Sequence, residues 1–225
     1  RVHPILKNGT DSESIYEVIR LGHTVAIDLD SPENIWARFT SQNRNKIKKA
    51  KNFGLECRHG LSEELFATFK TIYESTMDGD NAIPYYYFKD EFYQSILTDL
   101  KDNAEIFYIV DGEEIIAASI MLFENGNMHY HLSGSLYEQR TKAPSNLLLF
   151  EAAKWGSGQG FKSLHLGGGL GSKNDNLFEF KKSFYRGEYP TFSIGKRIME
   201  SDKCNYLMSL RPELENTGFF PPYRA

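Results

Sequence analysis

A lysine occupies a position where the sequence predicts the apolar face of a helix. Leu177, Phe180 and Phe184 recur at i, i+3 and i+7 and predict one buried stripe. Lys181 is the i+4 member of the same set, and a buried ammonium is costly unless it reaches solvent or meets an anion. Either the stem of Lys181 packs while its head reaches water, or the ammonium meets an anionic group. We take Lys181 as the candidate catalytic residue.

A strand predicted at residues 163–166 runs into this helix through glycines. Gly167 and Gly168 end the strand, and glycine leaves room for the backbone to approach a ligand closely. We therefore expect Gly167 and Gly168 to contact the substrate or the donor. Asp175 stands just before the helix, where it is better explained as an N-cap than as a general base.

The strand predicted at residues 128–133 carries further polar side chains. His129, His131 and Ser133 alternate along it, so we expect them on one face. If this face lines a cleft, His131, like His129, is a candidate general base because imidazole titrates near neutral pH. Ser133 is then a candidate substrate contact. The alternative is that these histidines are packed or surface residues.

Basic residues gather on a second predicted helix, which begins at Ser31-Pro32. The cluster consists of Arg44, Lys46, Lys48, Lys49 and Lys51. It is either a solvated helix face or a landing site for phosphates, with Arg44 and Lys48 as candidate contacts.

Single residues elsewhere complete the set of candidates. Arg140 and Lys142 precede a predicted helix whose N-terminus favours phosphates. Arg186 follows the lysine helix and is a further candidate phosphate contact. Most rings of the aromatic run at residues 85–88 are expected in the core, and Tyr85 is a candidate for lining a cleft.

Composition excludes several classes of function. The chain has 225 residues, of which 40% are hydrophobic and 14% aromatic, so we expect a globular protein with a core. A net charge of −4 argues against a uniformly basic nucleic-acid coat. The two cysteines are far apart and no His, Asp and Glu cluster has metal-ligand spacing, so we expect no metal site and a reducing, cytoplasmic setting. No apolar run approaches the roughly 20 residues of a membrane span, and the start at Arg1 leads us to expect a longer natural protein.

Periodicity predicts the helices and strands that position these residues. The predicted helices are residues 12–21, 31–53, 62–76, 87–100, 144–155, 177–184 and 202–210. The predicted strands are residues 24–29, 55–58, 106–110, 115–123, 128–133, 163–166 and 191–198. Asp111-Gly112 and Asn125-Gly126 predict two hairpins. The strand, helix and strand that follow them predict a right-handed parallel crossover.

This order of elements resembles the N-acetyltransferase (GNAT) fold, and in detail its FemABX branch, the aminoacyl transferases that build peptidoglycan cross-bridges. The matching segments are Arg44-Asn45-Lys46-Ile47-Lys48-Lys49-Ala50 with Gly54, Pro144 with Asn146-Leu147-Leu148, Leu166-Gly167-Gly168-Gly169, Leu177 with Phe180-Lys181 and Phe184, and Phe219-Phe220-Pro221 with Tyr223-Arg224. The resemblance implies an α/β GNAT fold with a mixed, mostly antiparallel sheet and flanking helices. It also implies that residues 1–58 are the end of a first GNAT-like subdomain and that residues 59–225 are a complete GNAT-like acyltransferase domain.

The resemblance further implies acyl transfer onto an amine of a peptidoglycan precursor, with Lys181 as the working lysine. It implies no tightly bound cofactor and a donor that is either aminoacyl-tRNA or acyl-CoA. The acceptor is then a nucleotide- or lipid-linked cell-wall precursor, reached in the cytoplasm or by peripheral contact with a membrane. Residues 139–144 lack the glycines of the usual CoA phosphate loop, which favours the tRNA donor. The alternatives are an acetyl-CoA-dependent N-acetyltransferase acting on a sugar amine or small metabolite, and a non-catalytic module that binds RNA or a partner protein.

Overall fold

The computed structural model describes residues 1–6, 12–214 and 219–224. They form two compact units, one of residues 1–23 and 190–225 and the other of residues 24–189. Every hydrophobic side chain found buried in the described part of the chain lies in the larger unit. All of the candidate site residues lie in the larger unit as well.

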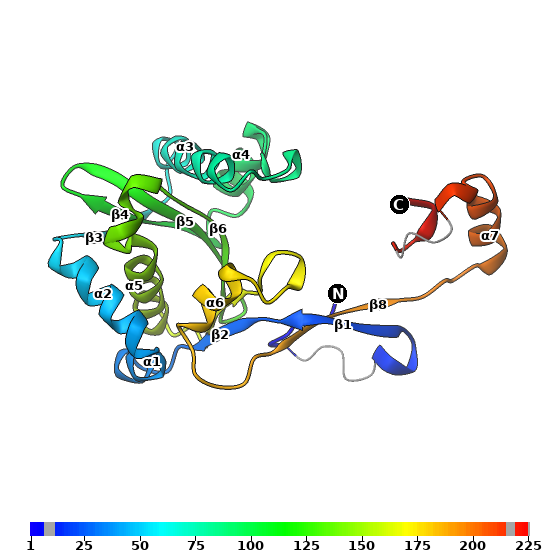
Figure 1. Cartoon of the computed structure of the whole chain (residues 1–225), viewed down its shortest axis with the longest axis horizontal. Helices are drawn as coiled ribbons and strands as arrows, with labels where there is room; N and C mark the ends of the chain where they lie inside the picture. The colour runs from blue at the N-terminus through cyan, green and yellow to red at the C-terminus, as the bar shows by residue number, and fades with distance from the viewer. Residues whose placement is uncertain (7–11, 215–218, 225) are drawn as a thin grey trace. The chain divides into compact units, whose positions relative to one another are not determined.

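The larger unit is built on a six-stranded sheet (Figure 1). In order across the sheet, its strands are β2 (Val25–Asp28), β7 (Ser163–Gly167), β6 (Asn127–Ser135), β5 (Glu114–Glu124), β4 (Ala104–Asp111) and β3 (Glu56–Gly60). Neighbouring strands are antiparallel except β6 and β7, which are parallel. Helix α5 (Pro144–Gly158) joins these two strands, so the predicted parallel crossover is confirmed.

Two tight turns produce the antiparallel meander of β4, β5 and β6. The first turn contains Gly112 at φ +64°, and the second contains Asn125 at φ +50° and Gly126 at φ +75°. Glycine adopts this left-handed conformation freely and asparagine does so at low cost. Both predicted hairpins are therefore confirmed for the reason that made them predictable.

Helices cover both faces of the sheet (Figure 1). One face is covered by α3 (Glu63–Gly79) and α4 (Asp90–Asp99), and the other by α1 (Pro32–Arg38), α2 (Ser41–Asn52) and α5. Each layer has its own cluster of buried hydrophobic side chains. The larger cluster, on the α5 side, is the one that reaches the candidate site.

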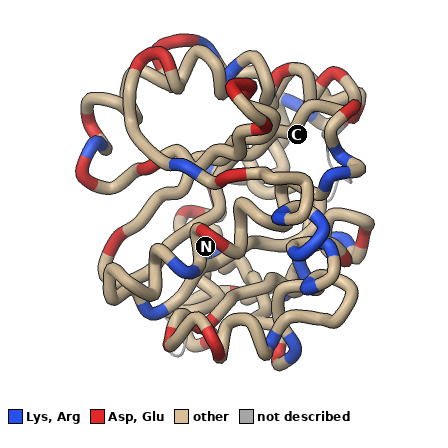
Figure 2. The backbone as a smooth tube through the Cα atoms, turned by 90° about the vertical axis from the view of Figure 1, so that its left-hand side faces the viewer, with Lys and Arg blue, Asp and Glu red and all other residues tan. Residues whose placement is uncertain are grey.

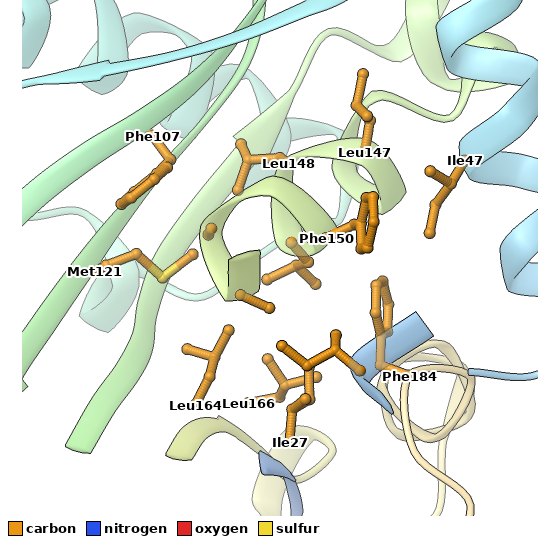
Figure 3. Close-up of a cluster of buried hydrophobic side chains, with 14 of the residues drawn as sticks. Ile27, Ile47, Phe107, Met121, Leu147, Leu148, Phe150, Leu164, Leu166 and Phe184 are labelled. Atoms are coloured by element: carbon orange, nitrogen blue, oxygen red, sulfur yellow. The ribbon is translucent and has the colours of Figure 1, made fainter. Parts of the chain in front are cut away.

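Figure 3 shows this larger cluster, in which α5 lies between the sheet and α2. Phe150 of α5 faces Ile47 of α2 and Phe184, which follows the lysine helix. The ring of Phe39 lies 5.9 Å from that of Phe150 and 5.2 Å from that of Phe184. Full burial of a phenylalanine stabilises a fold by roughly 1.5–3 kcal/mol. Phe184, at 0% exposure, therefore anchors the chain just beyond the candidate lysine.

The smaller unit is a two-stranded ribbon with a short helix. β1 (Glu17–His23) pairs antiparallel with β8 (Thr191–Lys196), and α7 (Ser201–Ser209) follows. The helix predicted at residues 12–21 is wrong, since only Ser12–Ser14 form a 3₁₀ turn. The β-branched residues of this segment favour a strand when β8 is available as a partner. The apolar spacing within the segment gives no information about that partner. The strand and the helix predicted near the C-terminus are confirmed.

The single helix predicted at residues 31–53 is two helices. α1 ends at Arg38, Phe39 is extended, and Thr40 caps α2 by accepting a hydrogen bond from the N–H of Asn43 at 3.2 Å. Apolar periodicity continues across the break and therefore hides it. The residue that could have revealed the start of a second helix is Thr40, because threonine favours the N-cap position. The predicted division into GNAT-like halves at residues 1–58 and 59–225 stays a prediction.

Candidate active site

β6 and β7 stop pairing where the candidate residues begin. Their parallel register ends at His129 and His165, although β6 continues to Ser135 and β7 to Gly167. Gly167 has φ +78°, a left-handed conformation that glycine adopts without strain. The chain therefore leaves β7 at a point where β6 no longer pairs with it, although β2 still does through Val25.

Lys181 lies on the buried face of α6 (Asn176–Lys182). The residue is 8% exposed, and its Nζ donates a hydrogen bond to the Gly168 carbonyl at 2.7 Å. Nζ also lies 5.9 Å from the centroid of the Tyr130 ring. Burial lowers the pKa of Lys181 to about 8, and the Asp175 carboxylate partly opposes this effect. The predicted burial of the ammonium is confirmed, and the ammonium faces the glycine turn.

The buried face of α6 differs by one residue from the predicted stripe. Leu177 is 44% exposed, whereas Phe178 is 4% exposed and belongs to the core together with Phe184. Asp175 sets this phase because its Oδ1 accepts a hydrogen bond from the N–H of Phe178 at 2.8 Å and thereby starts the helix. Asp175 is thus the N-cap that the sequence predicted.

Asp175 also closes the glycine turn. Its Oδ2 accepts a hydrogen bond from the N–H of Leu170 at 2.8 Å. Burial raises the pKa of Asp175, but the backbone hydrogen bonds outweigh burial and lower it overall. A Cβ atom at Gly169 would collide with the Asp175 carboxylate and a backbone carbonyl, so this position requires glycine. The turn that faces Lys181 is therefore closely specified.

A β-bulge redirects the side chains of β6. β5 pairs with Tyr130 and then directly with Leu132, so His131 has no partner on that strand. Tyr130 consequently packs with the cluster on the α5 side, and Leu132 with the cluster on the α3 side. Ser133, the next residue after Leu132, points back to the side of Tyr130. The expectation that His129, His131 and Ser133 share one face is therefore wrong.

The bulge separates the two candidate groups on β6. Ser133 hydrogen-bonds to the Tyr130 side chain, an interaction that lowers the pKa of Tyr130 against the larger, raising effect of burial. His131 lies beside Phe92 of α4, with ring centroids 6.2 Å apart, and desolvation lowers its pKa so that the ring is neutral at pH 7. The structure thus brings together Lys181, Gly167, Gly168, Ser133 and Tyr130.

Two of the candidate cations meet at the start of α2. Figure 2 views the molecule from the side on which α2 lies in Figure 1, and several Lys and Arg residues lie close together there. Arg44 Nη1 donates to the Phe39 carbonyl at 2.6 Å, so it satisfies the C-terminal end of α1. Arg44 Nη2 donates to Ser41 Oγ at 3.3 Å, and Arg186 Nη2 reaches the same oxygen at 3.4 Å. Lys48 is exposed on the outer face of α2.

The candidates before α5 have acidic partners. Lys142 makes an ion pair with Asp111, and Arg140 lies 4.0 Å from Asp80. Tyr85 is 77% exposed. In the part of the chain that the structure describes, none of these three candidates has a hydrogen bond or ion pair with Lys181.

The described residues give no support for a metal site, and Cys57 is not a reactive thiol. Within residues 1–6, 12–214 and 219–224, no three His, Cys, Asp or Glu side chains are placed to hold a metal ion. Burial raises the pKa of the Cys57 thiol to about 12, so it is protonated at neutral pH. Among the helices of the same residues, none has the length and the apolar content needed to cross a bilayer.

One family profile matches most of the larger unit. It is described as an acetyltransferase (GNAT) domain and matches residues 37–182. None of the curated proteins matches the chain.

Several solved structures share the fold at low sequence identity. FemX has a TM-score of 0.65 at 15% identity, with 84% of this chain and 67% of that chain covered. The C-terminal domain of a putative lysylphosphatidylglycerol synthetase from Agrobacterium fabrum has a TM-score of 0.62 at 13% identity, with 92% and 69% covered. The L-PGS of Bacillus licheniformis has a TM-score of 0.59 at 15% identity, with 90% and 68% covered. The predicted α/β fold with a mixed sheet and flanking helices is confirmed by these neighbours.

Proposed function

Because the chain belongs to the acetyltransferase (GNAT) domain family, we propose that it transfers an aminoacyl or acyl group onto an amine of a peptidoglycan precursor. The GNAT fold and the membership of an acyltransferase family are the premises of this proposal. The likeness to FemX supports a cell-wall acceptor, and the likeness to lysylphosphatidylglycerol synthetases supports a lipid-linked one.

The main observation that supports this proposal is the buried ammonium of Lys181. With a pKa of about 8, Lys181 is about nine-tenths protonated at pH 7, so it acts as a cation and not as a base. Its Nζ is hydrogen-bonded to the Gly168 carbonyl, at the place where β6 and β7 no longer pair with each other. A fixed cation in a water-poor site stabilises the negative charge that develops on a carbonyl oxygen during acyl transfer.

In the proposed reaction, the acceptor amine attacks the carbonyl carbon of the donor. A C–N bond forms, and the bond from the carbonyl carbon to the ester oxygen of aminoacyl-tRNA, or to the thioester sulfur of acyl-CoA, breaks. Lys181 stabilises the oxyanion, while Gly167, Gly168 and Ser133 contact the reactants. The amine loses one proton and the departing oxygen or sulfur takes one up, with water as the carrier. His131, the candidate base from the sequence, lies beside Phe92 on the α4 side of the sheet and so is not the base in this reaction.

The ion pairs before α5 argue against the usual CoA phosphate loop, and we propose a tRNA donor. Arg140 and Lys142, at the place of the CoA phosphate loop, already pair with carboxylates. Arg44, Lys48 and Arg186 are the proposed contacts to phosphates of the donor or of a nucleotide- or lipid-linked acceptor. We place the reaction in the cytoplasm, with peripheral membrane contact when the acceptor is a lipid.

A second candidate is an acetyl-CoA-dependent N-acetyltransferase acting on a sugar amine or small metabolite. The description of the matching family as an acetyltransferase domain favours it. The third is a non-catalytic module that binds RNA or a partner protein, in which Lys181 would have no role in chemistry.

The test is a comparison of donors followed by a lysine substitution. Thermal shifts are measured with acetyl-CoA, a UDP-linked muropeptide and an aminoacylated RNA minihelix, and transfer is then assayed with the ligands that stabilise the protein. Lys181→Ala is expected to lower kcat by about 10²-fold or more. Lys182→Ala is the matched control, because Lys182 is the next residue and pairs with Glu179 at 2.8 Å. Equal activity of both variants would remove the catalytic role of Lys181.

A further inference from the structure

Two arginines that are far apart in the sequence converge on one hydroxyl group. Arg44 Nη2 donates to Ser41 Oγ at 3.3 Å, and Arg186 Nη2 donates to the same atom at 3.4 Å. Neither guanidinium has an ion pair with a carboxylate among residues 1–6, 12–214 and 219–224. Two cations held this close repel each other, so the arrangement favours an anion that binds both.

A buried network fixes the two arginines relative to each other. The Ser183 carbonyl, just after α6, accepts hydrogen bonds from the N–H of Thr40 at 2.9 Å and from Asn43 Nδ2 at 3.2 Å. Asn43 Oδ1 in turn accepts a hydrogen bond from Asn146 Nδ2 of α5 at 2.8 Å. Asn43 is 1% exposed and Asn146 is 5% exposed. Since buried, satisfied amides hold one geometry, the start of α2 and the chain that carries Arg186 form a rigid base.

The start of α2 adds backbone donors at the same place. Thr40 is the N-cap and its Oγ1 accepts from the N–H of Asn43, so Ser41 and Gln42 occupy the first two helical positions. Their N–H groups have no intrahelical acceptor, and the structure gives them no other within the residues it describes. These donors lie beside the hydroxyl on which the two guanidiniums converge.

We infer that Arg44, Arg186, Ser41 and the first N–H groups of α2 bind a phosphoryl group, as a phosphate monoester or diphosphate. Guanidinium N–H groups donate charge-assisted hydrogen bonds to phosphoryl oxygens, and Arg44 offers its Nη2 side because its Nη1 is bonded to the Phe39 carbonyl. The two negative charges of a phosphoryl group suit two cations better than the single charge of a carboxylate does. The site deepens the proposed function, because it assigns a phosphorylated reactant to particular residues. Lys51 and Lys142 differ from these arginines, since each pairs with a carboxylate, and Lys48 differs because it is exposed on the outer face of α2.

The experiment is a titration of the whole chain with inorganic phosphate and with diphosphate at low ionic strength. Binding is monitored by the amide chemical shifts of the protein. We expect the largest shifts at the amides of Ser41 and Gln42. Arg186→Gln is expected to weaken binding about tenfold, the effect of losing one charge-assisted contact. Arg186 is exposed, so this variant is expected to fold. Uridine diphosphate and adenosine 3′,5′-bisphosphate, used as competitors, show by their relative affinities whether the acceptor or CoA supplies the phosphate.

Arg58→Gln is the matched control, because Arg58 is an exposed arginine on β3 that pairs with Glu56 at 3.0 Å. It removes the same charge and is expected to leave phosphate binding unchanged. Equal weakening by both variants, or shifts confined to residues 46–51, would overturn the inference in favour of diffuse attraction. The readout needs no acyl transfer, so the site and the activity are tested separately. Phosphate binding without transfer supports this site and removes the proposed activity. Transfer without phosphate binding supports the activity and removes this site.

Discussion

Replacement of Lys181 by methionine separates a catalytic cation from a structural one. Methionine conserves most of the unbranched side chain and removes the charge. Burial lowers the pKa of Lys181 from 10.5 to about 8, and a difference of one in pKa corresponds to about 1.4 kcal/mol. The charged form therefore destabilises the folded state by roughly 3 kcal/mol. The stability of the fold gains nothing from this cost. We therefore assign the Lys181 ammonium a role in catalysis.

The cost has a definite pH dependence. The folded pKa lies below the unfolded one, so between pH 8 and 10.5 the unfolded chain binds more protons and the free energy of unfolding rises with pH. Below this window both states are protonated and the full cost is present. Lys181→Met escapes the cost but loses the hydrogen bond to the Gly168 carbonyl, worth about 1 kcal/mol. We expect the variant to be more stable than the wild type by about 2 kcal/mol at pH 7, with this advantage gone by about pH 10.

The assay is urea denaturation of both proteins at pH 7, 8.5 and 10, paired with the transfer reaction. Lys182→Met serves as the control for a surface lysine, with no expected effect on either measurement beyond about 0.5 kcal/mol. The opposite result would be a Lys181→Met protein that is less stable than the wild type at pH 7 and still transfers normally. The ammonium would then be a structural donor to the glycine turn.

Three further substitutions test the surroundings of the lysine. Gly169→Ala is expected to destabilise the fold by about 2 kcal/mol or more, because its Cβ would meet the Asp175 carboxylate, and thermal unfolding measures the loss. Asp175→Ala should cost about 1 kcal/mol at pH 7, since it removes the cap of α6; the folded pKa is lowered, so wild type and variant should converge as the pH falls below 4. Asn146→Leu should cost about 1–3 kcal/mol in chemical denaturation by leaving the buried Asn43 oxygen unpaired, and a neutral result would show that the amide pair does not hold α2.

Most of the order of elements was predictable because most of the elements carry a local signal. Asp111-Gly112 and Asn125-Gly126 mark the hairpins through glycine and asparagine conformations. Ser31 and Ser62 mark helix starts, and both accept the expected capping hydrogen bonds. The burial of Lys181 followed from helical spacing alone, even though the buried stripe is shifted by one residue.

Apart from the break between α1 and α2, which Thr40 marks locally, the features that were missed depend on residues distant in sequence. The bulge at His131 is a mismatch between β5 and β6, so the alternation of β6 alone cannot reveal it. Tyr130 was missed because an aromatic residue on a strand is ordinarily a core residue, and only the approach of α6 brings it near Lys181. The meeting of Arg44 and Arg186 requires the packing of α2 against the end of α6. Such placements are tertiary, and no local pattern encodes them.

The position of Arg186 relative to Lys181 allows one donor to contact both residues. These residues are five apart in the chain, so their Cα atoms lie within about 18 Å of each other. In aminoacyl-tRNA, one ribose joins the reacting ester to the last phosphate, whereas in acyl-CoA the longer pantetheine arm joins the thioester to the diphosphate. If one donor contacts both residues, Arg186→Gln should weaken that donor about tenfold and leave a phosphate-free analogue, an acyl-pantetheine or an aminoacyl-ribose, unaffected. Unchanged donor affinity together with weaker acceptor binding would instead assign the phosphate to the acceptor, and the amine would then approach Lys181 from the α2 side.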